Sequence, residues 1–232
     1  MKRIHAFLLV LSLGLAAPAL AQPATASLAQ TRAAAERGDA EAQNSLGTMY
    51  QEGQGVPRNA AQAIAWYRKA ADQGLATAQF NLGAIYESAG RIIPSDYEQA
   101  VVWYRKAADQ KYAPAQSNLG MLYQKGLGVE QDYAQAVFLY RKAAEHGLAQ
   151  AQSRLGVMYL LGKGVTQDDA KAALWYRKAA EQGDDDAQTA LGILYEHGVG
   201  VAQDKTQAVF WYRKAAAQGN ADAQEALRKL GE

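Results

Sequence analysis

The amino-acid sequence predicts an all-α protein built as a linear array of helix-turn-helix units, a solenoid. The pair Leu-Gly returns with spacings of 36, 37, 36 and 36 residues, at Leu46, Leu82, Leu119, Leu155 and Leu191. The block WYRKAA stands at residues 66–71 and returns at 103–108, 175–180 and 211–216, with LYRKAA at 139–144. Apolar residues within each unit recur with the period of an α-helix. Because a fixed period of this length is typical of stacked units, the sequence predicts one elongated array.

Residues 1–21 are predicted to be a secretory signal peptide. Lys2 and Arg3 form a basic start, residues 6–17 are uncharged and mostly apolar, and residues 19–21 read Ala-Leu-Ala, a small-residue cleavage site. The apolar stretch is shorter than a membrane-spanning helix requires. We therefore expect cleavage after Ala21 and a periplasmic or secreted protein that does not insert into a membrane.

The composition of the remaining chain argues against some classes of partner. Removing Lys2 and Arg3 leaves 22 basic residues against 23 acidic ones. This balance does not favour attraction to nucleic acid or to an anionic membrane. The chain contains no cysteine, so an exported protein of this sequence depends on packing rather than on disulfides.

The periodicity divides the chain into five repeats and two capping helices. The repeats are predicted at residues 39–74, 75–111, 112–147, 148–183 and 184–219, between caps at residues 22–38 and 220–232. Residues 28–37 resemble the second helix of a unit without its aromatic residues, and Arg228 replaces the repeated glycine in the last unit. Polar terminal units keep an array from stacking on itself, so we expect a monomer.

The first helix of each unit has one face of leucine, alanine and tyrosine. At about 100° per residue, Ala78, Leu82 and Tyr86 share this face in the second repeat. The glycine that follows the leucine costs about 1 kcal/mol relative to alanine in the middle of a helix. Its return in every unit predicts a close helix approach that a side chain would block.

The second helix of each unit begins with a capping residue. Asn or Asp is followed three residues later by Gln, which resembles a capping box, at Asn59, Asp96, Asp132 and Asp204, while Asp168 is followed by Lys171. Within the first WYRKAA block, Tyr67 faces inward, whereas Arg68 and Lys69 point to the outer surface. A nucleic-acid surface needs rings and cations on the same side. We therefore expect a solvated cationic face and no nucleic-acid partner.

The repeated unit closely resembles the Sel-1-like repeat, a relative of the tetratricopeptide repeat. Its pattern is A-Q-x-x-L-G-x-x-Y-x-x-G-x-G-V, then Asp, then A-x-x-W-Y-R-K-A-A-x-x-G, over about residues 38–231. The distance from Leu46 to Ala63 is longer than in the tetratricopeptide pattern, which favours the Sel-1-like branch. The resemblance implies a right-handed α/α superhelix. It also implies an adaptor that assembles or regulates other proteins, in bacteria often in the cell envelope.

The second repeat departs from this pattern between its two helices. The segment ESAGRIIPSD at residues 87–96 lacks the glycine pair of the other units and carries Ile92 and Ile93. These residues could form an exposed docking point. The simpler interpretation is that Ile93 fills the place that Val129, Val165 and Val201 take in other units.

No catalytic or metal-binding pattern is present. Glycine pairs such as Gly126 and Gly128 lack the strand and third glycine of a dinucleotide fingerprint. His146 and His197 occupy different repeat positions, and three acids at Asp184, Asp185 and Asp186 are explained by helix capping rather than by calcium. The sequence therefore predicts no catalytic residue, no cofactor and no metal.

The face of the first helix opposite the leucine is predicted to line the concave side of the solenoid, as in the related family. Apolar residues occupy this face in the middle repeats and acidic residues follow them. The predicted partner-binding groove consists of Phe80, Met121, Val157, Leu160, Leu161, Ile193 and Glu196. An apolar strip with an acidic end suits an amphipathic or basic peptide segment. In the competing interpretation some of these side chains, especially Val157 and Ile193, pack between adjacent first helices.

The sequence therefore predicts a non-enzymatic scaffold or regulator of the cell envelope that binds a partner protein or peptide. The alternative is a cell-wall-processing enzyme or sugar-binding factor, either β-lactamase-like or peptidoglycan-related. A purified enzyme would turn over wall fragments or β-lactams, and a binding module would lose its function when the groove is substituted. A third possibility, a structural spacer, would tolerate those substitutions.

Overall fold

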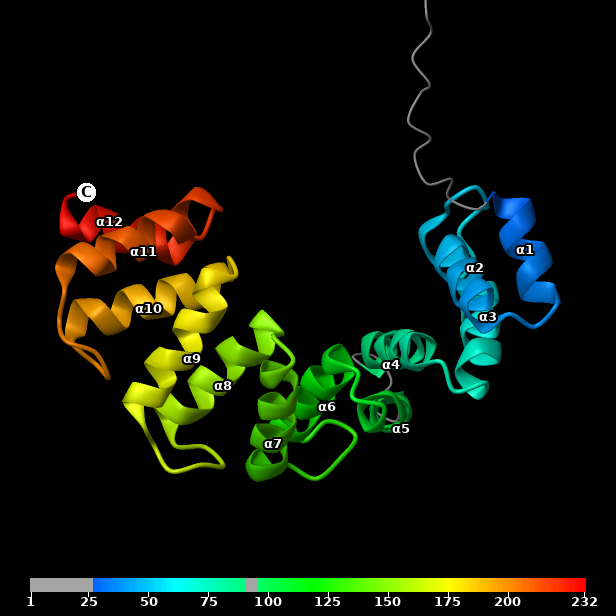
Figure 1. The fold of residues 1–232 in the computed structure, drawn as a ribbon, viewed down its shortest axis with the longest axis horizontal. Coiled ribbons are helices and arrows are strands. Elements are labelled where there is room, and N and C mark those ends of the chain that lie inside the picture. Colours follow the sequence, from blue (N-terminus) through cyan, green and yellow to red (C-terminus); the bar gives the residue numbers. More distant parts are fainter. Residues whose placement is uncertain (1–26, 91–95) are drawn as a thin grey trace, which may run out of the picture.

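The computed structural model of the chain describes residues 27–90 and 96–232. The predicted signal peptide and the Ile92 and Ile93 segment lie outside the described residues. The described chain is all-helical, with α1 (Leu28–Glu36), α2 (Ala40–Glu52), α3 (Ala60–Asp72), α4 (Ala76–Gly90), α5 (Asp96–Asp109), α6 (Ala113–Lys125), α7 (Tyr133–Glu145), α8 (Ala149–Leu161), α9 (Asp169–Glu181), α10 (Asp185–His197), α11 (Lys205–Ala217) and α12 (Ala221–Leu230). The helices follow a curved path from α1 to α12 (Figure 1). The predicted all-α solenoid is confirmed.

The packing of the helices defines five stacked pairs. Each first helix packs most extensively on the second helix of its own unit, in the pairs α2 with α3, α4 with α5, α6 with α7, α8 with α9 and α10 with α11. It also packs on the second helix of the preceding unit. In the middle of the curve, α4 and α6 lie closer to its inner side than α5 and α7 (Figure 1). Stability in such an array depends on contacts between neighbouring units.

The core of every unit is a tyrosine ring laid against the glycine of the first helix. The tyrosine of the WYRKAA block is at most 4% exposed in all five units, at Tyr67, Tyr104, Tyr140, Tyr176 and Tyr212. A Cβ atom placed on Gly47 would lie 2.7 Å from Cδ1 of Tyr67, far inside van der Waals contact. The predicted close approach at this glycine is confirmed, and the neighbour is a ring from the second helix of the same unit.

Four second helices, α3, α7, α9 and α11, begin directly after the predicted capping residue, whereas α5 begins at Asp96 itself. The capping differs from a full capping box. The side chain of Asn59 accepts a hydrogen bond from the backbone N–H of Gln62 at 3.0 Å, and Asp132 accepts one from Gln135 at 2.9 Å. The backbone N–H of Asn59 donates to the carbonyl oxygen of Tyr50 at 2.9 Å. Since the first helix already satisfies that N–H, the returning bond from Gln62 is not needed.

A buried glutamine joins each unit to the one before it. The Nε2 atom of Gln152 in α8 donates to the carbonyl oxygen of Ala144 at the end of α7, at 3.1 Å. Its Oε1 atom accepts from Nε2 of Gln182, the residue directly after α9, at 2.7 Å. The same bond to the preceding helix end is made by Gln43, Gln79, Gln116 and Gln188. These bonds satisfy carbonyl groups that a helix end would otherwise leave unpaired.

The arginines of the WYRKAA blocks are more than a solvated face. Arg105 is exposed, as predicted, but its Nη2 atom donates to the hydroxyl of Tyr123 in the next unit at 2.8 Å. The same bond joins Arg68 to Tyr86, Arg141 to Tyr159 and Arg177 to Tyr195. The expectation of a purely solvated cationic face is therefore corrected for the arginines, because each reaches across one unit boundary.

The five buried tyrosines predict a loss of stability at alkaline pH. Burial raises the pKa of each phenol above its ordinary value near 10, at Tyr67, Tyr104, Tyr140, Tyr176 and Tyr212. Above pH of about 10 the unfolded chain therefore binds fewer protons than the folded chain, so the free energy of unfolding falls as pH rises. Below that pH their contribution is fully present. Urea unfolding followed by circular dichroism should show a constant midpoint near neutral pH and a falling one above pH of about 10. A midpoint unchanged above that pH would contradict this account.

Candidate partner-binding face

The hydroxyls of the buried tyrosines lie on the side of the first helices that is opposite the repeated leucine. In four units the hydroxyl donates to the side chain five residues after the leucine. The acceptors are Gln51 for Tyr67 at 2.7 Å, Glu87 for Tyr104 at 2.6 Å, Gln124 for Tyr140 at 2.6 Å and Glu196 for Tyr212 at 2.6 Å. Each hydroxyl therefore emerges at the edge of the predicted groove. We call this surface the first-helix face.

Two hollows lie on the first-helix face. The first has a volume of about 410 Å³ and lies between α8 and α10, lined by Gln150, Ser153, Arg154, Val157, Tyr176, Asp184, Asp186 and Ala190. The second has a volume of about 370 Å³ and lies between α10 and α12, lined by Ile193, Glu196, His197, Tyr212, Asp222, Glu225, Ala226 and Lys229. Most of the first-helix residues in these linings occupy the repeat positions predicted to form the groove. Neighbouring first helices therefore build one hollow per unit boundary at this end of the array.

The predicted groove residues fall into two groups by exposure. Leu161 is 55% exposed and Ile193 is 44% exposed, so both present apolar surface to a partner. Val157 lines the first hollow, and Leu160 is half-buried against the core. Leu161 occupies the same repeat position as His197, which lines the second hollow.

Phe80 and Met121 contribute more to the core than to the accessible surface. Phe80 is half-buried, and its ring centroid lies 5.6 Å from that of Tyr104 and 5.5 Å from that of Tyr112. Met121 is only 7% exposed and belongs to the core. A flexible thioether side chain readily fills gaps between helices. The expectation of an accessible Met121 is therefore wrong, and the apolar surface of the groove is smaller than predicted.

The C-terminal end of the first-helix face is acidic. Glu196 accepts the Tyr212 hydroxyl, while Asp222 and Glu225 line the second hollow together with Lys229. Glu225 is already paired with Arg228 and Lys229, so Glu196 and Asp222 are the carboxylates of this hollow outside these ion pairs. Asp184 caps α10 by accepting from the backbone N–H of Ala187 at 2.8 Å. Burial raises the pKa of the Asp184 carboxyl, and the charges of Asp186 and Asp185 raise it further. This end of the face is suited to a positively charged partner.

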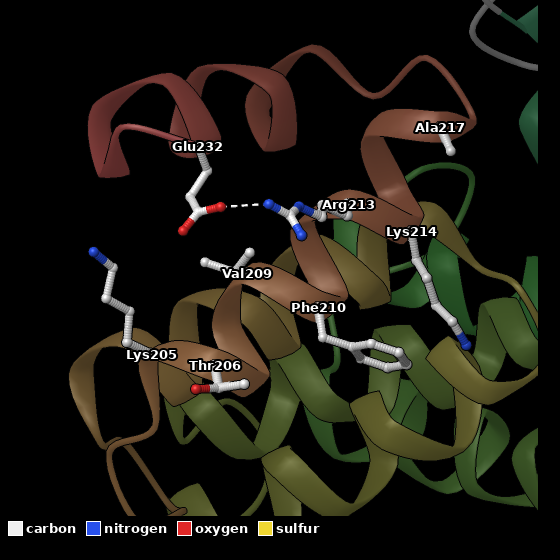
Figure 2. Close-up of a pocket in the computed structure, with 8 residues that line it drawn as sticks. All are labelled: Lys205, Thr206, Val209, Phe210, Arg213, Lys214, Ala217 and Glu232. Atoms are coloured by element: carbon white, nitrogen blue, oxygen red, sulfur yellow. Dashed lines mark hydrogen bonds and ion pairs between the residues drawn. The ribbon is translucent and has the colours of Figure 1, made fainter.

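A further hollow lies elsewhere, on the outer side of α11. It has a volume of about 780 Å³ and is lined by Lys205, Thr206, Val209, Phe210, Arg213, Lys214, Ala217 and Glu232. Figure 2 shows Arg213 directed toward the carboxylate of Glu232, with which it forms an ion pair, and the Lys214 side chain beside the Phe210 ring. The Nζ atom of Lys214 lies 4.8 Å from that ring's centroid. The equivalent pair in the third repeat, Phe138 and Lys142, lines a smaller hollow of about 270 Å³ among α5, α6 and α7.

Phe210 belongs to an outer apolar row that the sequence analysis missed. The row occupies the position two residues before the buried tyrosine and is between 44% and 48% exposed, at Val102, Phe138, Leu174 and Phe210. Lysine covers part of it, since Nζ of Lys142 lies 4.3 Å from the centroid of the Phe138 ring. The recurrence of a large apolar residue at this position in four of the five units was the available signal.

Membrane-spanning helices and clusters of metal-binding side chains are both absent from residues 27–90 and 96–232. Over these ranges, no helix combines the length and the apolar character needed to cross a membrane. Over the same part of the chain, no three or more His, Cys, Asp or Glu side chains are grouped so that they could hold a metal ion.

Comparison with known proteins places these features in a family. The Sel1 repeat matches five consecutive segments, at residues 40–75, 76–112, 113–148, 149–184 and 185–220. These matches cover more than half of the chain and every stacked pair of helices described above. The chain therefore belongs to the Sel1 repeat family. This repeat is a fold that generally mediates protein–protein interaction and is typically non-enzymatic.

Solved structures with the same fold include two with substantial sequence identity. A protective antigen of uropathogenic Escherichia coli, c5321, which displays an SLR fold, is 42% identical with a TM-score of 0.78; the match covers 84% of this chain and 42% of the antigen. A Sel1 repeat protein from Oxalobacter formigenes is 40% identical with a TM-score of 0.75, covering 83% of this chain and 78% of that one.

A more distant structure shares the fold alone. It is a putative Sel1 repeat protein from Klebsiella pneumoniae, 23% identical with a TM-score of 0.56, and the match covers 88% of this chain and 98% of that one. This chain spans less than half the length of the E. coli antigen. Comparison with curated proteins gives no significant match.

Proposed function

We propose that this protein is a non-enzymatic scaffold or regulator that is exported to the periplasm or beyond and, as a monomer, binds a segment of a partner protein on its first-helix face. Membership of the Sel1 repeat family supports a role in protein–protein interaction. The sequence of residues 1–21, which resembles a signal peptide, supports export. The partner itself is defined here only by its chemistry, as an extended or helical segment with basic residues.

The observation that carries this proposal is the repetition of hollows at equivalent places on neighbouring first helices. The first hollow lies between α8 and α10 and the second between α10 and α12. A single chain segment laid across the array could therefore place successive side chains into successive hollows. Exposed Leu161 and Ile193 add apolar contact surface, and a binding site of this kind gains most of its affinity from a few such residues.

Substitution of one exposed residue on each face tests the proposal. We expect Leu161→Glu to abolish capture of the partner in an in-cell crosslinking pull-down, because it buries a charge against the partner's apolar side chains. Phe138→Glu, on the outer row, is the matched control. The two wild-type side chains are 55% and 47% exposed, so both substitutions should leave the fold intact by circular dichroism.

The outcomes separate the proposed face from the alternatives. Loss of capture in Leu161→Glu alone supports the first-helix face. Loss in Phe138→Glu alone would place binding on the outer row and contradict the proposal. Turnover of peptidoglycan fragments or β-lactams by the purified wild-type protein would instead support the enzymatic alternative.

A further inference from the structure

One of the buried tyrosines differs from the others in its hydroxyl group. Tyr67, Tyr104, Tyr140 and Tyr212 each donate to a Gln or Glu on the first helix of their own unit. In the fourth repeat that position is Leu160, which cannot accept a hydrogen bond. Within the described part of the chain, no hydrogen-bond partner of the Tyr176 hydroxyl is found.

The next unit does not supply a partner either. Asn118, one residue before the repeated leucine of α6, donates to the hydroxyl of Tyr104 at 3.0 Å. The equivalent residue facing Tyr176 is Ala190. A small apolar side chain at this place both leaves the hydroxyl unpaired and leaves space beside it, and Ala190 lines the first hollow.

The Tyr176 hydroxyl is directed to the first hollow and not into the core. The residue is 96% buried, being 4% exposed, and it lines this hollow. The fully buried side-chain atoms without a hydrogen-bond partner in the described structure belong to Thr77, Gln116, Ser117 and Trp211. The Tyr176 hydroxyl oxygen has no partner among the described residues either, but it is not one of these fully buried atoms. The oxygen therefore reaches the surface of the hollow, where a ligand could contact it. Burial also raises the pKa of Tyr176 to about 12.

The remaining polar groups divide the hollow into two sides. Arg154 comes from α8, and its guanidinium carbon lies 5.8 Å from the centroid of the Tyr140 ring. Within residues 27–90 and 96–232 this guanidinium forms no ion pair. Burial raises the pKa of the Tyr140 hydroxyl, and the hydrogen bond and the charge of Arg154 lower it by a smaller amount, so the ligand would share this donor with Tyr140. Asp184 and Asp186 line the hollow from the start of α10. The donors Tyr176 and Arg154 therefore come from the fourth repeat, and the carboxylates come from the fifth.

We propose that this hollow binds a basic segment of the partner peptide. A main-chain carbonyl of the segment accepts from the Tyr176 hydroxyl and from Arg154, and a Lys or Arg side chain lies against Asp184 and Asp186. This inference rests on the proposed function, since it assigns a partner chemistry to the same face. The volume of about 410 Å³ is within the range of ligand pockets, roughly 300–1,000 Å³. The neighbouring hollow adds the carboxylates of Glu196 and Asp222, while its Glu225 is paired with Arg228 and Lys229.

The test begins with a peptide probe. Dodecapeptides selected from a random display library on the immobilised protein are expected to carry Lys or Arg. A fluorescent copy of the selected peptide is then titrated with the purified protein. Its affinity should fall as salt is added, because exposed charge pairs are screened. It should also fall in Asp186→Asn, which removes one carboxylate from the hollow and keeps its shape.

Two substitutions test the hydroxyl in different ways. Tyr176→Phe removes the donor, and Leu160→Gln supplies an internal acceptor like Gln124, which receives the hydroxyl of Tyr140 at 2.6 Å. Both should weaken probe binding about three- to tenfold, the amount expected from one hydrogen bond. Tyr104→Phe is the matched control. Its hydroxyl is bonded to Glu87, and the residue lines neither hollow, so probe affinity should stay unchanged.

Thermal unfolding of the same variants should show the opposite order. Tyr104→Phe loses an internal hydrogen bond and should unfold at a lower temperature, whereas Tyr176→Phe loses none and should unfold as the wild type does. A hydroxyl that binds the ligand changes the probe affinity but not the unfolding temperature, and a structural hydroxyl does the reverse.

The outcomes distinguish this inference from the proposed function. If Leu161→Glu abolishes probe binding while Tyr176→Phe and Leu160→Gln leave it unchanged, the first-helix face binds peptide but the role of the hydroxyl is overturned. Selection of acidic or uncharged probes overturns the basic occupant. If no probe is selected, the proposed function fails and this inference fails with it.

Discussion

Replacing Tyr140 with alanine is expected to lower the free energy of unfolding by about 3–5 kcal/mol, the usual cost of removing a buried aromatic ring. Tyr140 is completely buried, and its ring lies 2.9 Å from the place where a Cβ on Gly120 would stand. The glycine leaves no side chain that could fill the resulting cavity. Urea unfolding followed by circular dichroism measures the loss.

A conservative substitution at the same position separates the ring from its hydroxyl. Tyr140→Phe keeps the ring and loses only the bond to Gln124, so it should cost about 1 kcal/mol. If the alanine and phenylalanine variants unfolded at the same urea concentration, the ring would not be the main packing element of the unit.

Substitution of Gly164 by alanine is expected to destabilise the boundary between the third and fourth repeats by roughly 2–5 kcal/mol. Gly164 has a φ of +71°, which costs an L-residue about 1–2 kcal/mol. A Cβ there would also collide with the backbone carbonyl of Tyr133 at the start of α7. Because backbone cannot move aside as a flexible side chain can, the two units must separate or shift.

Gly147 provides the matched control for this prediction. Its φ is +86°, but a Cβ there would meet nothing within 4 Å. Gly147→Ala should therefore show only the conformational cost of about 1–2 kcal/mol. Equal losses in the two alanine variants would mean that the contact of Gly164 with α7 contributes nothing.

Repetition explains why so much of the fold could be predicted. Each repeat position is sampled five times, so the leucine, the glycine after it and the inward tyrosine are recognised without an alignment. The helical period then separates Tyr67 from Arg68 and Lys69, and the structure confirms that the tyrosine is buried and the cations are exposed. The helix starts at Asn59 and Asp132 followed from capping chemistry.

Contacts between units could not be predicted in the same way, because helical angles describe one helix at a time. The bonds from Arg68 to Tyr86 and from Gln152 to Ala144 depend on how neighbouring units stack. The constant spacing of 18 residues between the arginine and the tyrosine was a usable signal that the sequence analysis did not consider. The burial of Met121 could not be predicted for the same reason, because it depends on the packing of the adjacent helices.

The candidate site was predicted in outline, and its detail came from the structure. The repeat positions of the predicted groove coincide with much of the lining of the two hollows, through Val157, Ile193 and Glu196. The unpaired hydroxyl of Tyr176 was not predictable, because the other units first had to show that this hydroxyl normally bonds to the residue at the position of Leu160. The difference at Tyr176 was therefore visible only in the structure.

The measurement that tests the central claim most directly is site-specific photo-crosslinking in cells. A photoreactive amino acid is placed at residues 161 and 193 on the first-helix face and at residues 138 and 174 on the outer row; all four wild-type side chains are exposed. We expect one partner to crosslink to residues 161 and 193 and not to residues 138 and 174. Crosslinks from the outer row alone would contradict the assignment of the first-helix face as the binding surface.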